Sequence, residues 1–398
     1  MSMLIPNVRS FSIPTVMKHG FGATALLPEI IKSLGLRRPM IVTDPGIVRA
    51  GLLDFVAGPL KAAGQAYLLF TEVVSNPPVA LVDRGARVYS DENCDGLIGF
   101  GGGSSMDTAK SIGVVAVHGG SIRDYQWADP QPIRRRIPPT IAIPTTAGTG
   151  SEMTLWAVIS DPERQLKFNV GGTADIGAWV ALVDPKLTLG LPASITAATG
   201  MDALAHAIEC YTCAYAQPLT DAVALWAMET IGRYLRLAYT DGNSQEARYQ
   251  MSMAAMLAGL AYGTESAGAA HAMSQSAGGV HDVPHADLTA RLLAPVMEYN
   301  YPAQPDKFAR IAVALGQDIR GVSAPQAAEK VVQAVYQLTD ELKIPTLQKL
   351  GFDEQEIPFL AEIAAKDPQT IGNPRDIDQL GYEQVWQRAF DKGKSSSM

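Results

Sequence analysis

The stretch Asp95–Lys110, DGLIGFGGGSSMDTAK, joins an apolar strand pattern to a helical pattern through three consecutive glycines. Glycines in a row let the backbone approach an anion closely, and Ser104 or Ser105 can cap the helix that follows. The free N–H groups at the start of that helix favour a pyrophosphate. An ordinary tight turn is the alternative, because the spacing matches neither the P-loop nor the G-x-G-x-x-G pattern. The stretch therefore predicts a strand–turn–helix unit and leaves its nucleotide role open.

Strand patterns alternate with helical patterns on both sides of this unit. The predicted strands are Arg38–Asp44, Ala66–Phe70, Asp95–Phe100 and Thr140–Pro144, and the helices between them include Leu26–Ser33, Val48–Ala63 and Val79–Glu92. This alternation predicts an α/β layer with a mostly parallel sheet.

From about Thr196 onward the strand patterns disappear and Ala-, Leu- and Met-rich helical patterns follow. A chain of 398 residues is long enough for two domains. We predict an α/β domain over residues 1–188 and an all-α domain over residues 189–398, with the boundary near Asp184–Pro192. The predicted helices of the second domain are Thr196–Tyr215, Leu219–Tyr239, Gln245–Tyr262, Asp306–Leu315, Ala324–Leu342 and Tyr382–Asp391.

Composition argues against several classes of protein. The net charge is −8, without a basic cluster, which argues against nucleic-acid and anionic-membrane partners. No segment reads as a signal peptide or a membrane span. Three cysteines are too few for a disulfide framework, so we expect the protein to be located in the reducing cytoplasm. Cys210 and Cys213 form a C-x-x-C inside a predicted helix, and two buried thiols are a better interpretation than a redox or zinc site.

A second Gly/Thr-rich loop, Pro144–Glu152, follows another predicted strand. Its hydroxyls and backbone donors suit a nicotinamide ribose or a phosphate. Asp44 ends an earlier strand and can accept from the adenosine ribose hydroxyls, and its charge would repel a 2′-phosphate, so NAD is favoured over NADP. The alternative for Asp44 is a helix-capping acid before Pro45, and both roles can hold at once.

Histidines gather late in the chain, in the stretch His271–Leu288, HAMSQSAGGVHDVPHADL. His271 and His285 lie on either side of the pair Gly278 and Gly279, where we expect a helix to break and turn the chain back. Both imidazoles can then face one point. By itself this pattern is weak, because a single buried histidine is more often a core residue than a ligand.

An earlier segment strengthens the metal hypothesis. Asp202 and His206 stand four residues apart, which places them on one face of a helix. With His271 and His285 they supply one carboxylate and three imidazoles, a complete ligand set for a divalent transition metal. The set suits iron, zinc, cobalt, nickel or manganese.

The motifs GGGSSMDTAK, IPTTAGTGSEMT, TGMDALAHAIE and HAM…PH, in this order and spacing, resemble the iron-containing (group III) alcohol dehydrogenase family. The resemblance runs from IPTVMKHGFGA near the N-terminus to the late Asn373-Pro-Arg. It implies a dehydroquinate synthase-like architecture, with a Rossmann-like dinucleotide-binding domain, a helical domain, and metal and substrate between them. It also implies NAD, Fe2+ or another divalent metal such as Zn2+, and a homodimer or larger assembly.

The same resemblance implies roles for individual residues. Asp202, His206, His271 and His285 match the metal ligands of the family. The residues that it places at the cofactor are Asp44, Asn76, Gly101, Gly102, Gly103, Ser104, Asp107, Thr145, Thr146, Thr149 and Lys167.

The sequence departs from the family pattern near the ligands. Gln275 stands where a second histidine of HAMAH is usual, and Ala286 replaces the glycine after the last ligand. A glutamine cannot change charge, so Gln275 can orient water or substrate but cannot relay a proton by titrating. His281 stands where the family often has tyrosine, and we predict that it takes over proton transfer. The alternative is a loop residue or a partner of another side chain.

The resemblance implies the reaction as well. The metal acts as a Lewis acid on the oxygen of a small primary alcohol or aldehyde, and a hydride passes to or from NAD. Two alternatives share the fold: a glycerol-dehydrogenase-like or hydroxyacid–oxoacid transhydrogenase activity, and a non-catalytic nucleotide-binding protein. Lys167 and Arg291 could meet an anionic substrate, or they could serve the cofactor and a surface ion pair. The expected substrate pocket comprises Trp156, Lys167, Phe168, Tyr262, Thr264 and His281.

Overall fold

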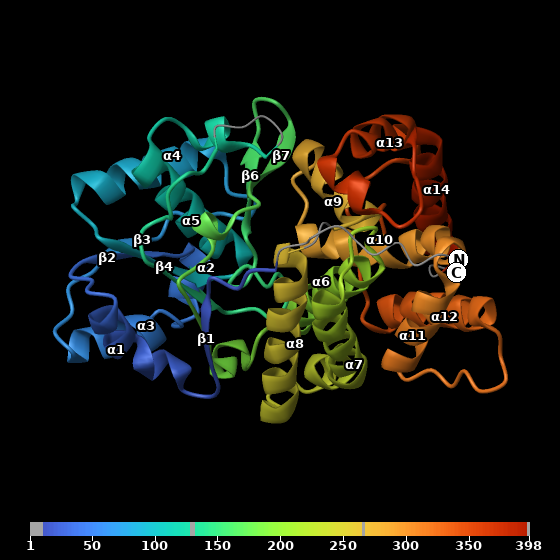
Figure 1. Cartoon of the computed structure of the whole chain (residues 1–398), viewed down its shortest axis with the longest axis horizontal. Helices are drawn as coiled ribbons and strands as arrows, with labels where there is room; N and C mark the ends of the chain where they lie inside the picture. The colour runs from blue at the N-terminus through green and yellow to red at the C-terminus, as the bar shows by residue number, and fades with distance from the viewer. Residues whose placement is uncertain (1–10, 128–131, 265–266, 396–398) are drawn as a thin grey trace.

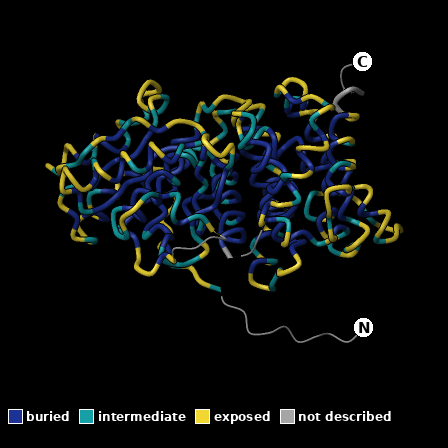
Figure 2. Tube along the Cα trace, turned by 90° about the horizontal axis from the view of Figure 1, so that it is seen from above, coloured by how far each residue is buried: buried dark blue, intermediate teal, exposed yellow. Residues whose placement is uncertain are grey.

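The structure is a computed structural model that describes residues 11–127, 132–264 and 267–395, with only the backbone of residues 264 and 393–395. Figure 1 shows a half built around a sheet beside a half built of helices. Buried residues run through both halves and across the junction between them, and exposed residues follow the outer turns (Figure 2). In the described part of the chain, no helix has the length and apolar character to cross a bilayer.

Six parallel strands form the sheet, in the order β1-β8-β5-β4-β2-β3. All four predicted strands are present, and two short strands that the patterns did not reveal join them. The strands are β1 (Val16–His19), β2 (Pro39–Val42), β3 (Leu68–Phe70), β4 (Gly96–Gly101), β5 (Thr140–Pro144) and β8 (Val180–Val183). The mostly parallel α/β arrangement is confirmed.

Helices cover both faces of the sheet because alternate side chains of each strand point to opposite faces. Met40 and Val42 pack with α4 (Val79–Asp91) and α5 (Gly103–His118), whereas Ile41 packs with the helices of the other face. Those helices are α1 (Leu27–Ser33) and α3 (Asp54–Ala62). The sheet therefore carries one core on each face.

The single helix predicted over Val48–Ala63 is wrong. Two helices, α2 (Pro45–Arg49) and α3, take its place. Gly51 lies between them with φ +72°, a left-handed conformation that ends the first helix.

An antiparallel hairpin, formed by β6 (Trp156–Asp161) and β7 (Leu166–Gly171), was not predicted. Figure 1 shows it at the top of the molecule, reaching toward the helical half. Two side chains of α5, the buried Lys110 and the partly buried Asp107, hold it to the sheet half. Lys110 Nζ donates to the carbonyl oxygens of Thr154 (3.1 Å) and Trp156 (2.8 Å), and the Val158 amide donates to Asp107 Oδ2 (3.0 Å).

Described residues beyond Val183 contain helices and no strand, which confirms the helical second half. The helix α6 is almost wholly buried at its centre. The helices of this half are α6 (Ala193–Thr212), α7 (Pro218–Thr240), α8 (Gln245–Thr264), α9 (Ala269–Val280), α10 (His285–Asn300), α11 (Pro305–Ala314), α12 (Ala324–Glu341), α13 (Ile357–Ala365) and α14 (Gln379–Ser395). All three cysteines are buried, and none forms a disulfide.

The predicted break at Gly278 and Gly279 is also wrong, since α9 continues through both glycines to Val280. A Cβ built on Gly279 would lie 2.9 Å from the carbonyl oxygen of Gln165 and 2.9 Å from the amide of Lys167. These glycines therefore let α9 approach the backbone of the hairpin. The chain turns only afterwards, and α10 begins at His285 after Pro284.

Replacing Gly279 with alanine should lower the free energy of unfolding by about 1–3 kcal/mol, because the new methyl group meets backbone atoms that cannot move aside. Gly278 gives a matched control on the same helix. A Cβ there would meet only the end of the Lys167 side chain, at 2.7 Å. Chemical denaturation of G278A should show a smaller loss than G279A, and equal losses would contradict this account of the contact.

Candidate active site

A cavity of about 120 Å³ lies where the two halves meet. The sheet half contributes residues from the start of α5, from the Gly/Thr-rich loop after β5 and from the hairpin. The helical half contributes residues from α6, α8, α9 and α10. Of the residues that the sequence analysis proposed, those lining the cavity are Asn76, Gly103, Ser104, Asp107, Thr149, Trp156, Lys167, Asp202, His206, Tyr262, His271, Gln275 and His285.

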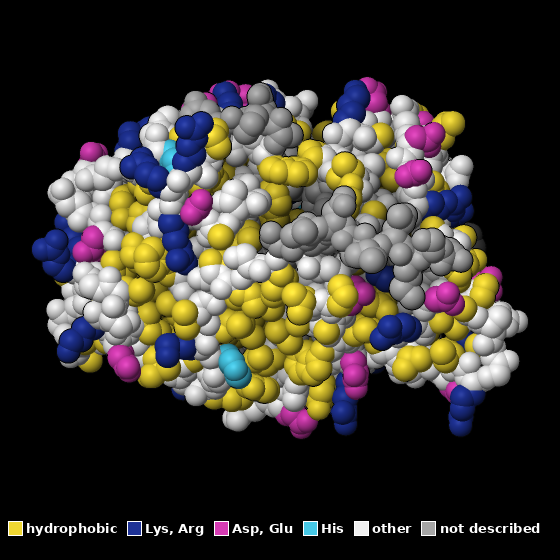
Figure 3. Space-filling view, in the orientation of Figure 1, with side chains coloured by type: hydrophobic (Ala, Val, Ile, Leu, Met, Phe, Trp, Pro, Cys, Tyr) yellow, Lys and Arg dark blue, Asp and Glu magenta, His cyan; other side chains and the backbone are white. Residues whose placement is uncertain are grey.

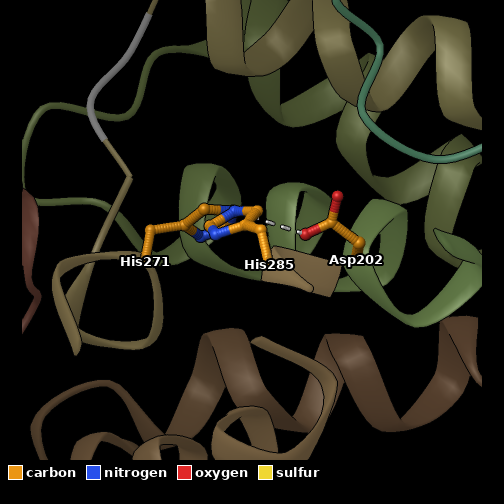
Figure 4. A group of neighbouring side chains, drawn as sticks. All are labelled: Asp202, His271 and His285. Carbon is orange, nitrogen blue, oxygen red and sulfur yellow. Dashed lines mark ion pairs between the residues drawn. The ribbon is translucent and has the colours of Figure 1, made fainter. Parts of the chain in front are cut away.

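Asp202, His271 and His285 bring one ligand atom each to within 4.8 Å of one another. Figure 4 shows the two imidazoles beside the carboxylate. Asp202 Oδ1 lies 3.8 Å from His271 Nε2 and 3.9 Å from His285 Nε2. Both oxygens of Asp202 and Nε2 of His271 are buried, and none of these atoms has a hydrogen-bond partner in the described part of the chain. Buried polar atoms are rarely left unsatisfied, and a divalent cation among these atoms would satisfy them. The residues present fit a metal ion.

His206 lies beside this group of three rather than within it. Its ring stacks on His271, with 4.5 Å between ring centroids, and on Tyr262, with 4.7 Å. It lines the same cavity one turn after Asp202 on α6. Of the four predicted ligands, three therefore form one cluster and the fourth is its stacked neighbour.

Burial sets the protonation of the cluster. It lowers the pKa of His206 and of His285 well below the usual histidine value, and the neighbouring His271 lowers both further. Burial also raises the pKa of Asp202 to about 6. Neutral imidazoles keep the lone pairs that a metal requires, and a bound cation would favour the ionised carboxylate.

Glu209, which the sequence analysis did not select, orients one of the imidazoles. Its Oε2 lies 2.5 Å from Nδ1 of His271, and its Oε1 accepts from the Ala270 amide at 2.7 Å. Burial alone would lower the pKa of His271, but the charge of Glu209 and this hydrogen bond raise it. A carboxylate on the far nitrogen fixes the ring and its tautomer for a metal. A signal was present in the sequence, because Asp202, His206 and Glu209 share one face of α6.

On the sheet side, three glycines shape the turn between β4 and α5. Gly101 has φ +147°, and a Cβ there would lie 2.5 Å from Ser105 Oγ. A Cβ on Gly103 would lie 2.9 Å from the Thr149 side chain. The residue that precedes α5 is Gly102, and no described side chain caps the helix. The predicted capping by Ser104 or Ser105 is therefore wrong, because both serines lie inside α5.

The Gly/Thr-rich loop lies directly beside this turn. The Thr145 amide donates to the Gly101 carbonyl oxygen at 2.9 Å, and Thr146 is the nearest side chain to Gly102. Both loops follow the carboxyl ends of adjacent parallel strands, where nucleotides bind in open α/β sheets.

Asp44 and Asp107 both accept backbone hydrogen bonds. Asp44 Oδ1 accepts from the Gly46 and Ile47 amides, so the capping interpretation holds, while Oδ2 lies 3.4 Å from a Cβ built on Gly101. Asp107 accepts from the Val158 amide and from Ser151 Oγ at 2.5 Å. It therefore fastens the Gly/Thr-rich loop and the hairpin to α5.

Lys167 and Asn76 connect the halves. Lys167 is buried on β7, and burial lowers its pKa to about 8. Asn76, with φ +53°, donates to Asp282 Oδ1 at 2.7 Å. Both side chains line the cavity.

His281 and Arg291 lie elsewhere. His281 Nε2 is 2.8 Å from Glu356 Oε1, its ring packs on Phe352, and it does not line the cavity. This position favours the alternative role, a partner of another side chain, over proton transfer. Arg291 does not line the cavity, donates to the carbonyl oxygens of Pro345 and Ile344, and pairs with the exposed Asp340 at 4.0 Å, which favours the ion-pair role over contact with an anionic substrate. Phe168 lines an adjoining cavity, and the side chain of Thr264 lies outside the described residues.

Comparison with known proteins identifies relatives over almost the whole chain. Sequence profiles described as "Iron-containing alcohol dehydrogenase" and "Fe-containing alcohol dehydrogenase family, C-terminal" match residues 14–185 and 196–390. The chain is 52% identical over 383 residues to choline dehydrogenase of Bacillus subtilis (strain 168), covering 96% of this chain and 95% of that protein. It is 39% identical over 377 residues to the NAD-dependent methanol dehydrogenase of Bacillus methanolicus, covering 93% and 98%. A crystal structure of a 1,3-propanediol oxidoreductase superposes with a TM-score of 0.92 at 37% identity, covering 96% of this chain and all of that one.

Replacing Glu209 with glutamine should lower metal affinity by about 10–100-fold, because the amide orients the His271 ring without the carboxylate charge. Metal retained after dialysis against graded chelator, measured by elemental analysis, checks this. Glu229→Gln, at an exposed position on α7, is the control and should bind metal as the parent does. Parental affinity in E209Q would contradict the assigned role.

Proposed function

The chain belongs to the iron-containing alcohol dehydrogenase family, and on that premise we propose that it interconverts a small primary alcohol and its aldehyde in the cavity between its halves. Membership of the family makes it a metal-dependent oxidoreductase that works with NAD. The observation that carries the proposal is the cluster of Asp202, His271 and His285 in one cavity with Gly103 and Ser104.

In this proposal Asp202, His206, His271 and His285 hold the metal. When bound, the metal supplies Lewis acidity at the alcohol oxygen, and NAD accepts or donates the hydride. The residues assigned to the cofactor are Asp44, Asn76, Gly101, Gly102, Gly103, Ser104, Asp107, Thr145, Thr146, Thr149 and Lys167.

The chain's own residues do the remaining work. The N-terminus of α5, free of a side-chain cap, attracts the pyrophosphate, and the ammonium of Lys167 adds positive charge where the halves meet. The buried walls exclude water, which strengthens each electrostatic contact inside. Gln275 orients substrate or water, and His281, paired with Glu356, stands outside the cavity.

We assign the two roles to separate domains, residues 1–188 for NAD and residues 189–398 for metal and substrate. Support comes from the position of the last strand, which ends at Val183, and of the first long helix, which begins at Ala193.

A homodimer or larger assembly in the cytoplasm completes the proposal. The strand β1 is an edge of the sheet, and its Val16 and Met17 are 58% and 36% exposed. Figure 3 shows hydrophobic side chains gathered over this part of the molecule and the adjacent α8. An edge strand with exposed apolar side chains is a natural surface for a second copy.

Removing the metal with a chelator should abolish NADH formation while NAD still binds, because the two ligands contact different residues. Adding Fe2+ anaerobically should restore turnover, and Zn2+ in a parallel sample tests metal preference. NAD binding followed by calorimetry provides the second readout. NADH formation by fully metal-free protein would contradict the proposal.

Choline is the second, more specific candidate substrate, favoured by the 52% identity to a choline dehydrogenase. Trp156 and Tyr262 line the cavity, and Trp127 packs edge-on against Trp156, with 5.3 Å between ring centroids. Aromatic faces attract quaternary ammonium groups.

A panel of choline, methanol, 1-propanol, 1,3-propanediol and glycerol should give the highest kcat/KM with choline if these rings recognise its cation. A ranking in which choline is no better than 1-propanol would remove it. Absence of NADH with every alcohol, together with exchange between a hydroxyacid and an oxoacid, would indicate the transhydrogenase instead.

A further inference from the structure

A hydrogen-bonded group of one carboxylate and two amides lies in the wall of the catalytic cavity. Gln275 Nε2 donates to Asp367 Oδ2 at 3.2 Å. Gln369 donates to Asp367 Oδ1 twice, from its backbone amide at 2.9 Å and from its Nε2 at 3.3 Å. The three residues are only 4%, 8% and 4% exposed, in the order Gln275, Asp367, Gln369. This group is therefore shielded from bulk water.

Its position connects two cavities. Gln275 lies one helical turn after His271 on α9 and lines both the catalytic cavity and an adjoining cavity of about 520 Å³. Asp367 lines only the adjoining cavity. The carboxylate thus lies behind the amide as seen from the catalytic cavity.

A carboxylate can only accept hydrogen bonds, so it fixes which way each amide points. Gln275 must turn its NH2 group toward Asp367, and among the described residues its Oε1 has no hydrogen-bond donor. Gln369 must do the same, and its Oε1 accepts from the Tyr262 hydroxyl at 3.0 Å. Asp367 therefore fixes the orientation of the Gln275 amide, which lines the cavity, and of the Gln369 amide, which binds the cavity residue Tyr262.

We propose that Asp367 is a positioning residue that presents Gln275 Oε1 to the substrate as a hydrogen-bond acceptor. The enzyme then prefers alcohols that carry a second hydrogen-bond donor or a positive charge beyond the reacting carbon. This inference rests on the proposed function, because it concerns the same cavity.

The preference follows from what happens to Gln275 Oε1 when a substrate excludes water. A second hydroxyl donates to this oxygen, and a quaternary ammonium presents its polarised methyl groups to it. An alkyl tail leaves the oxygen unsatisfied. A single neutral hydrogen bond of this kind changes kcat/KM by about three- to tenfold.

None of the three cationic residues that line the adjoining cavity, Arg164, Lys167 and Lys366, forms an ion pair with Asp367 among the described residues. Arg164 pairs with Asp161 and Lys366 with Glu362, each at 2.6 Å. Lys167 lies on β7, in the other half of the molecule. These groups are the same in the parent and in a variant of Gln275, so the change in preference between the two proteins isolates the contribution of Gln275 from these charges.

Two matched pairs of alcohols test the proposal with metal-loaded enzyme and NAD. The first pair is 1,3-propanediol and 1-butanol, and the second is choline and 3,3-dimethyl-1-butanol. Burial raises the pKa of Asp367 to about 6, so assays at about pH 8 keep it ionised. The ratio of kcat/KM within each pair is the readout, because effects common to both alcohols cancel.

The parent should prefer the first member of each pair, mainly through a lower KM. Asp367→Asn should reduce both ratios by about three- to tenfold, since an asparagine amide no longer fixes the direction of Gln275. Asp367→Glu keeps the charge and should restore at least part of the preference. Glu229→Gln, at an exposed residue of α7 that lines neither cavity, is the control and should leave both ratios unchanged.

Gln275→Leu gives an independent route to the same answer should D367N fold poorly. It should lose the preference, and the double variant should lose no more than Q275L alone, as two residues acting through one contact require. Absence of preference in the parent, parental ratios in D367N, or additive losses in the double variant would overturn the inference. NADH formation from the alcohols in those cases would leave the proposed function standing, whereas no oxidation of any alcohol would overturn the proposed function itself.

Discussion

A carboxylate buried without a donor is the constraint on which the site depends. Asp202 is fully buried at the centre of α6, and neither of its oxygens has a hydrogen-bond partner among the residues that the structure describes. Burying a charge in this way costs a great deal of free energy unless a counter-charge accompanies it. The packing of α6, α9 and α10 places Nε2 of His271 and of His285 3.8 and 3.9 Å from Asp202 Oδ1, too far for a hydrogen bond, so the arrangement favours an ion from outside.

Much of the fold could be predicted from the sequence, because it follows from local patterns. Short apolar runs alternating with amphipathic helices gave four of the six parallel strands, and the four-residue spacing of Asp202 and His206 placed both on one face of α6. The continuation of α9 through Gly278 and Gly279 could not be predicted this way. Glycines usually weaken a helix, and here their purpose is a tertiary contact with β7 that no local pattern reveals.

Part of the candidate site also follows from local sequence patterns, and part depends on tertiary contacts. The order of the motifs selected the residues of both loops and of the Asp202, His271 and His285 cluster. The order of the motifs does not predict the direction of a side chain. His281 lies close to His285 in sequence, yet it contacts Glu356 outside the cavity. Asp367 meets Gln275 across 92 positions of chain, and no spacing rule connects residues so far apart. Glu209 differs, because its spacing from Asp202 and His206 already placed it on the same face of α6. Its contact with His271 was not recognised from the sequence.

The β6–β7 hairpin contacts both the helix that follows the glycine turn, α5, and the helix that carries His271, α9. Its first strand is fastened to α5 through Lys110 and Asp107, and its second strand touches the backbone of α9 at Gly279. The helix that begins after the Gly101–Gly102 turn and the helix that carries His271 are thus connected through this one hairpin. A displacement of the hairpin caused by a ligand at one end would reach the other end, and thermodynamic linkage would make such an influence mutual. The hairpin is therefore where cooperativity between nucleotide and ion would be transmitted.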